Sequence, residues 1–235
     1  MNYTVAGFTD IGKRDRQEDS ILYEELTVNQ KSVVVAAVAD GIGGLMRGEV
    51  AGGYVIERIF ALLFEKITGL AAINASMPKI VQCIKQCLFE MAKEFEDFSK
   101  ENGIMLGSTL SLLVIVEREY AIVHIGDSKI YLMKKKRVVD ITPIHRNEDG
   151  SLNRCIGSFG YFDPYIKRGR IRRNMGFLLC SDGFWQKGRE DLKILNTVDI
   201  KTEEQISKRL VTIASKVKQK KENDNISALF LVVKR

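Results

Sequence analysis

A run of seven apolar residues, 33–39, constrains the fold of this chain more than any other feature. Because the run contains only valine and alanine and does not alternate with polar residues, it predicts a β-strand buried on both faces. The run stops at Asp40-Gly41, and apolar residues then recur at helical spacing through residues 49–66 and again through 77–100. The sequence therefore predicts a buried strand that is followed by two long helices.

Short strand-like segments separated by turns dominate the rest of the chain. An opening strand is expected at residues 3–8, and a helix is expected at residues 203–217. The later strands are expected at 108–116, 120–125, 129–133, 137–141, 176–180 and 226–233. The first four of these suggest an antiparallel meander. Strands, then a helix pair, then strands again indicate an α/β (α+β) domain with largely antiparallel sheets.

Composition and length favour one globular domain over residues 1–235. Of these residues, 45% are apolar and 28% are charged, and no linker, repeat or low-complexity tract interrupts them. The N-terminus lacks the features of a signal peptide, and no apolar run is long enough to span a bilayer. The cysteines, which show no metal-ligand spacing and are expected to be reduced, are Cys83, Cys87, Cys155 and Cys180. We therefore expect a soluble cytoplasmic protein with no membrane association.

The formal net charge is +6, and three basic runs at residues 134–137, 167–173 and 216–221 supply much of it. The preferred interpretation of each run is a solvated face or loop. A modest positive field still favours an anionic substrate such as a phosphorylated protein. Aromatic residues are not interleaved with the basic runs, so nucleic acid is not expected as a partner.

Acidic residues lie at the ends of several strand-like runs, where a rigid scaffold can direct short side chains to one point. Taken singly, an Asp-Gly pair after a strand is usually a turn. Together, the acidic residues form a set of oxygen ligands of the kind that Mg²⁺ and Mn²⁺ prefer. The set comprises Glu18-Asp19, Asp40-Gly41, Gly126-Asp127-Ser128, Ser181-Asp182-Gly183 and Asp224-Asn225.

The chain has two histidines, His124 and His145, which are too few and wrongly placed for a zinc site. His124 alternates within a strand-like run, so we expect it to be packed or hydrogen-bonded. The carboxylate set therefore favours Mg²⁺ or Mn²⁺ over zinc.

These stretches resemble the metal-dependent protein phosphatases, the PPM or type 2C family. The matching segments occur in the order of the family at residues 9–20, 38–44, 48–51, 107–110, 125–131, 179–185 and 224–228. The resemblance implies a four-layer αββα sandwich, in which two antiparallel β-sheets are flanked by antiparallel helix pairs. It also implies a binuclear metal site in a cleft at one end.

The resemblance assigns a role to individual residues. Asp40 would bridge two Mn²⁺ or Mg²⁺ ions, Gly41 would offer its carbonyl, and Glu18 would hold one ion. Asp182 and Asp224 would hold the other ion. Residues outside this ligand set would be Asp19, which orients metal-bound water, and Arg14, which binds phosphate.

The chemistry implied is hydrolysis of phosphoserine and phosphothreonine in proteins by a water activated between two metal ions, without a phosphoenzyme. The expected partners are phosphorylated proteins and an opposing Ser/Thr kinase, and we expect a monomer. This analogy comes from compact bacterial members of the family.

The sequence departs from the family pattern at three places. Ile42 stands where some members have a histidine proposed as general acid. Asp127 matches, with Asp182, a residue of a third and weaker metal site, but Gln186 replaces another acidic ligand, so a third ion is not favoured. The segment 141–157 is shorter than the usual flap of the family.

Two other interpretations fit parts of the sequence. Residues 7–13 match the glycine and lysine spacing of a phosphate-binding P-loop, but Arg14 stands where Ser or Thr should hold Mg²⁺. The chain could also be a weakly active or inactive phosphatase-like regulatory or binding module. The presence of Glu18, Asp40, Asp182 and Asp224 favours an active phosphatase over this alternative.

Overall fold

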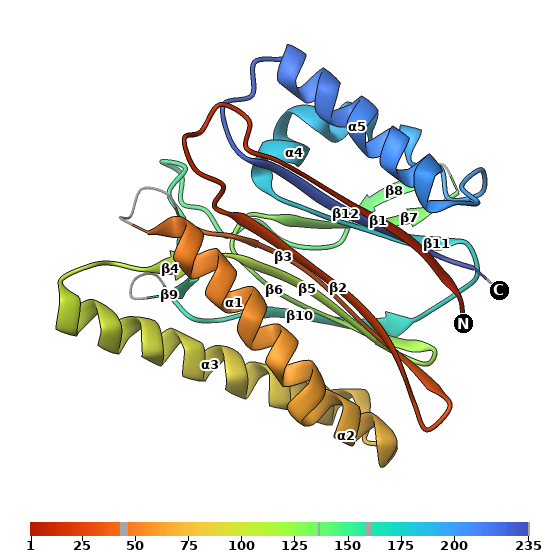
Figure 1. The fold of residues 1–235 in the computed structure, drawn as a ribbon, viewed down its shortest axis with the longest axis horizontal. Coiled ribbons are helices and arrows are strands. Elements are labelled where there is room, and N and C mark those ends of the chain that lie inside the picture. The colour runs from red at the N-terminus through yellow and green to blue at the C-terminus, as the bar shows by residue number, and fades with distance from the viewer. Residues whose placement is uncertain (43–46, 136, 158–160, 235) are drawn as a thin grey trace.

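Two antiparallel five-stranded sheets face each other in the computed structural model, which describes residues 1–42, 47–135, 137–157 and 161–234 (Figure 1). Sheet A has the strand order β1 (Tyr3–Asp10), β12 (Ile226–Val233), β11 (Met175–Cys180), β7 (Lys129–Lys134) and β8 (Arg137–Asp140). Sheet B has the order β10 (Tyr165–Arg170), β6 (Glu119–Ile125), β5 (Leu110–Val116), β3 (Lys31–Asp40) and β2 (Asp19–Val28). A short pair joins β4 (Gly107–Ser108) to β9 (Ile156–Gly157).

Helices cover the outer face of each sheet and complete four layers, which confirms the expected fold class (Figure 1). Sheet B is covered by α1 (Gly48–Leu62), the π-helical turn η1 (Leu63–Ile67), α2 (Thr68–Ala72) and α3 (Met77–Asn102). Sheet A is covered by α4 (Asp182–Gly188), the 3₁₀ segment η2 (Arg189–Ile194) and α5 (Glu203–Gln219). Helix α5 begins where Thr202 and Gln205 form a capping box.

Strand β3 explains why its sequence is apolar without alternation. Val33, Val35 and Ala37 pack into the core beneath α1 and α3, whereas Val34 and Val38 pack into the core between the two sheets. All of them are fully buried, because one face of the strand meets helices and the other meets the opposite sheet. The prediction of a strand buried on both faces is confirmed.

The predicted meander is wrong, because its four strands belong to two different sheets. Strands β5 and β6 form a hairpin in sheet B, and β7 and β8 form a hairpin in sheet A. The chain crosses between the sheets at Gly126-Asp127-Ser128. Hydrophobic spacing gives the position of each strand but not the sheet that it joins. The crossing carries Asp127 to one end of the sandwich.

Strands β2 and β10, which the sequence pattern did not reveal, are the two edges of sheet B. The basic stretch 167–173 was expected to be a solvated face or loop, and its first four residues lie in the edge strand β10, which pairs with β6. Charged residues on an edge strand discourage pairing with other chains, so edge strands have a weak apolar pattern.

Three residues of the sequence motifs, Gly43, Gly44 and Lys136, lie outside the described residues. Among the described helices, none is long and apolar enough to cross a membrane.

Candidate functional site

Five carboxylates from separate segments line one cavity of about 400 Å³ at an end of the sandwich. Asp40 ends β3, Asp182 begins α4 two residues after the end of β11, and Asp224 lies two residues before β12. The other two are Asp127 in the crossing between the sheets and Glu18 just before β2. The cavity is also lined by Arg14, Gly41, Ile42, Thr109, Arg146, Gly150, Ser151 and Leu152. The structure therefore brings together every site residue expected from the sequence except Asp19.

Asp19 lies beneath this cavity rather than in its lining. It pairs in register with Asp40 across β2 and β3, and it is only 5% exposed. Burial raises the pKa of Asp19 to about 6. Within the described part of the chain its Oδ2 atom is buried without a hydrogen-bond partner. The hydroxyls of Ser227 and Ser181 favour the charged form of Asp19, so its buried carboxylate adds negative charge beside Asp40 that a cation would compensate.

The other carboxylates disfavour one another's charge. Burial raises the pKa of Asp40 well above its ordinary value, and the charges of Asp19, Asp182 and Asp127 raise it further. Burial, followed by repulsion from Asp127 and Asp224, raises the pKa of Asp182 to about 7. Several carboxylates in one cavity are stable as anions only when cations compensate them. The donor set therefore fits hard divalent cations such as Mg²⁺ and Mn²⁺.

Two arginines provide part of this compensation. Arg14 Nη2 lies 2.8 Å from Asp224 Oδ2. The Arg146 guanidinium contacts both Asp127 and Asp182, with Nη2 2.6 Å from Asp182 Oδ2. In the described residues, no group of three or more His, Cys, Asp or Glu side chains is gathered closely enough to hold an ion as it stands. The donor chemistry fits, but a bound ion would compete with Arg14 for Asp224 and would share the Asp182 carboxylate with Arg146.

Hydroxyls and backbone groups hold Asp40 in place. The Asp40 N–H donates to Thr109 Oγ1 at 3.0 Å, and the Thr109 N–H donates to the Asp40 carbonyl at 2.9 Å. Ser108 Oγ donates to the same carbonyl at 3.1 Å, and Thr109 Oγ1 lies 3.1 Å from Ser128 Oγ. The segment 107–110 is thus the support of Asp40, a role that the sequence pattern did not indicate.

Asn225 fixes the loop that carries Arg14 and Glu18. The Glu18 N–H donates to Asn225 Oδ1 at 2.8 Å. The Asn225 amide nitrogen donates to the carbonyls of Ile11 at 2.8 Å and Arg16 at 3.0 Å. This side chain therefore ties residues 11–18 to the start of β12, 207 positions away from Glu18.

The histidines are structural, as expected for His124. His124 is fully buried, and its ring nitrogens lie 2.9 Å from Ser111 Oγ and 3.1 Å from the Pro143 carbonyl. Burial lowers the pKa of His124 to about 3 and that of His145 to about 4. Both rings are therefore neutral at pH 7.

The P-loop interpretation is wrong. Residues 7–10 belong to β1, and residues 11–18 form the loop to β2 instead of the helix that a P-loop requires. Lys13 points to Asn223, with its Nζ 3.2 Å from the side-chain oxygen.

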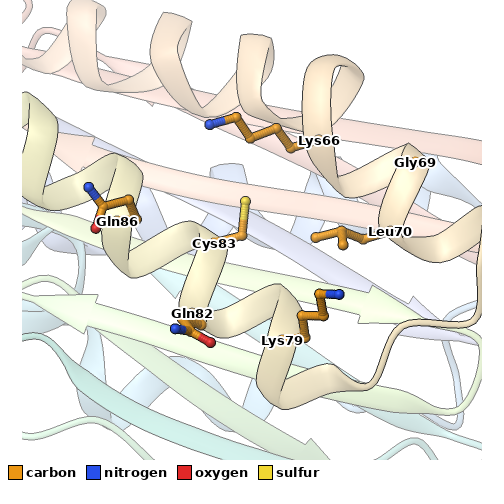
Figure 2. A pocket seen from close by; sticks show the side chains of 7 residues that line it. All are labelled: Lys66, Gly69, Leu70, Lys79, Gln82, Cys83 and Gln86. Carbon is orange, nitrogen blue, oxygen red and sulfur yellow. The ribbon is translucent and has the colours of Figure 1, made fainter.

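A larger hollow of about 530 Å³ lies on the helical layer over sheet B (Figure 2). It is lined by Lys66, Gly69, Leu70, Lys79, Gln82, Cys83 and Gln86, from η1, α2 and α3. Its described lining residues include no carboxylate, and none of them lines the cavity around Asp40. The smaller cavity, where the titratable groups converge, is therefore the candidate site.

The sequence model of the family described as protein phosphatase 2C matches residues 7–229. The chain belongs to the protein phosphatase 2C family. It is 26% identical over 198 residues to the serine/threonine protein phosphatase PstP of Mycobacterium tuberculosis, covering 76% of this chain. The matched region is 37% of PstP, so the chain spans less than two fifths of that relative.

Solved structures of this family share the fold. The serine/threonine phosphatase Stp1 of Staphylococcus aureus superposes with a TM-score of 0.83 at 18% identity, covering 100% of this chain and 96% of that one. The phosphatase PstP/Ppp of Mycobacterium tuberculosis superposes with a TM-score of 0.75 at 22% identity, covering 99% of both chains.

Proposed function

We propose that this protein is a metal-dependent serine/threonine phosphoprotein phosphatase built as a single domain over residues 1–235. One observation supports this most directly: five carboxylates and Arg14 share one cavity on a protein phosphatase 2C fold. The substrates would be proteins that carry phosphoserine or phosphothreonine. The protein would act as a cytoplasmic monomer against a Ser/Thr kinase, without nucleic acid or membrane partners.

Each residue of the cavity has a proposed role. The ligands of two Mn²⁺ or Mg²⁺ ions would be Glu18, Asp40, Gly41 through its carbonyl, Asp182 and Asp224. When bound, such ions lower the pKa of water and neutralise charge that develops on phosphorus. The buried Asp19 carboxylate would orient water from below Asp40.

Two further residues of the cavity bear on proton transfer and on phosphate binding. Ile42 lines the cavity beside Gly41 and cannot donate a proton, so the leaving oxygen would be protonated by water or by another group. Arg14 has a side chain that is 45% exposed, and it can turn from Asp224 toward a substrate phosphate.

Metal dependence of hydrolysis is the direct test. We expect the purified protein to release phosphate from a phosphothreonine peptide with Mn²⁺ or Mg²⁺, and to stop when a chelator is added. An Asp40→Asn preparation is the control for contaminating phosphatases. Release that persists in chelator, or that the Asp40→Asn preparation reproduces, would count against the proposal.

The Arg14→Lys variant tests how the phosphate is held. Lysine keeps the charge but loses the planar fork that grips two oxygens. We expect KM for the peptide to rise about tenfold, equivalent to about 1.4 kcal/mol, with kcat changed less than KM. Arg16→Lys is the matched control, because Arg16 in the same loop pairs with Glu49 at 2.8 Å and does not line the cavity. An unchanged KM in Arg14→Lys would remove Arg14 from phosphate binding.

A weakly active or inactive binding module is the second candidate function. The ion pairs of Arg14 and Arg146 favour it, because they already occupy Asp127, Asp182 and Asp224. The same assay separates the two functions, since a folded protein that releases no phosphate with any metal would support the module.

A further inference from the structure

Arg146 is held rigidly against the loop that carries Asp127. The preceding residue, His145, donates its N–H to the Gly126 carbonyl at 3.0 Å, and the Gly126 N–H donates to His145 Nδ1 at 3.1 Å. Arg146 itself bridges to Leu152. The base of the arginine side chain is therefore fixed from both sides, and its guanidinium enters the cavity from the short segment 141–157.

The guanidinium binds two carboxylates at once. Arg146 Nε donates to Asp127 Oδ2 at 2.5 Å, and Nη2 contacts the same carboxylate and lies 2.6 Å from Asp182 Oδ2. The Asp127 side chain is 5% exposed and that of Asp182 is 13% exposed. Charge-assisted contacts of this kind are strong where water is excluded, and removing the arginine would leave buried charges uncompensated.

Gln186 contributes to the same arrangement. Its amide nitrogen donates to Asp182 Oδ2 at 2.8 Å, so this oxygen receives hydrogen bonds from both Gln186 and Arg146. Neither donor uses Asp182 Oδ1. An acidic side chain at position 186 would repel Asp182, whereas the amide donates to it. On this side of Asp182, Arg146 therefore supplies a positive charge and Gln186 supplies a neutral hydrogen-bond donor.

We propose that Arg146 is a built-in cation that occupies the place of a third divalent ion between Asp127 and Asp182. This rests on the proposed two-ion phosphatase centre. The guanidinium compensates the two carboxylates on the side facing segment 141–157, and Asp182 Oδ1 is left for the two-ion centre. A divalent ion and the guanidinium cannot occupy the same position. The centre therefore loads two ions, and removing the Arg146 charge opens a third position.

Counting bound Mn²⁺ tests this proposal without measuring activity. Each protein is dialysed against excess Mn²⁺, and the ions bound per chain are measured by elemental analysis and by the electron spin resonance of free Mn²⁺. We expect two ions in the wild type, three in Arg146→Gln, and two again in the double variant Arg146→Gln/Asp127→Asn. Arg154→Gln is the matched control with two ions, because Arg154 lies in the same segment but pairs with Asp163.

The change in ion number on replacing Arg146 tests the role of Arg146 even where the wild type binds fewer than two ions. A wild type that binds fewer than two ions would overturn the two-ion centre, whereas a gain of one ion in Arg146→Gln would still support Arg146 as the cation. A wild type with three ions, or no gain in folded Arg146→Gln, would overturn the role of Arg146. If Arg146→Gln does not fold, Asp127→Asn provides the test: an unchanged count supports the proposal, and a lost ion overturns it.

Discussion

Asparagine at position 40 is expected to lower phosphatase turnover by at least about 100-fold and to raise the melting temperature of the metal-free protein. Replacing a group that only supports a metal ligand typically lowers activity by about 10- to 100-fold. Replacing Asp40, a proposed ligand itself, should lower it further. Without metal, burial and the charges of Asp19, Asp182 and Asp127 raise the pKa of Asp40, so its anion destabilises the fold. Asparagine has the same shape without that charge.

The pH dependence of the melting temperature identifies the cause. An acid whose folded-state pKa is raised above its unfolded value of about 3.9 favours the fold at low pH and loses that contribution as pH rises through the folded pKa. The advantage of Asp40→Asn in chelator should therefore grow from pH 5 to pH 8. For a chain of this length, each kcal/mol in the free energy of unfolding shifts the melting temperature by about 2–4 °C.

A surface carboxylate provides the matched control for this experiment. Asp163 has a side chain that is 53% exposed and pairs with Arg154, so Asp163→Asn should change neither turnover nor the melting temperature appreciably. Wild-type turnover in Asp40→Asn, or a lower melting temperature than wild type in chelator at pH 8, would contradict the role assigned to Asp40.

The sequence predicted the positions of the carboxylates because local signals encode them. Asp40 is the last residue of a strand whose apolar run ends sharply, and Asp182 lies two residues beyond the end of another apolar strand. Their convergence could be inferred only from the resemblance to a family, because the crossing at residues 126–128 depends on which sheet each hairpin joins. Spacing along the chain carries no information about that choice.

Arg146 had no signal in the sequence. It lies in an irregular segment, and its partners Asp127 and Asp182 are 19 and 36 positions away. An arginine in such a segment is usually solvated, and the contacts of His145 with Gly126 and of Arg146 with Leu152 place it in the cavity. Its role depends on tertiary packing rather than on periodicity or composition.

The glycines of the two Asp-Gly pairs in the site, Gly41 and Gly183, serve a different purpose from the one that sequence suggests. Asp-Gly after a strand predicts a turn with special backbone angles, but neither Gly41 nor Gly183 has a positive φ. A Cβ atom on Gly41 would lie 1.9 Å from the Gly48 carbonyl oxygen, and one on Gly183 would lie 2.1 Å from the Asn225 carbonyl oxygen. These glycines allow other backbone segments to approach the aspartates closely.

Gly183→Ala is therefore expected to destabilise the protein, although Gly183 lies in helix α4. Alanine in a helix normally stabilises by up to about 1 kcal/mol relative to glycine. Here the added methyl group meets a backbone carbonyl at a distance that requires β12 or α4 to move, and such overpacking costs about 1–3 kcal/mol. The movement would also separate Asp182 from Asp224, so we expect turnover to fall by about tenfold or more.

Gly53→Ala is the control that isolates this contact. Gly53 lies within α1, and the described residues leave its Cβ position without a neighbour within 4 Å. The same substitution should therefore raise or preserve the melting temperature at Gly53 and lower it at Gly183, as measured by thermal unfolding in chelator. Equal effects at both positions would mean that helix propensity alone sets the outcome. Opposite effects would show that Gly183 is required for the close approach between α4 and the start of β12.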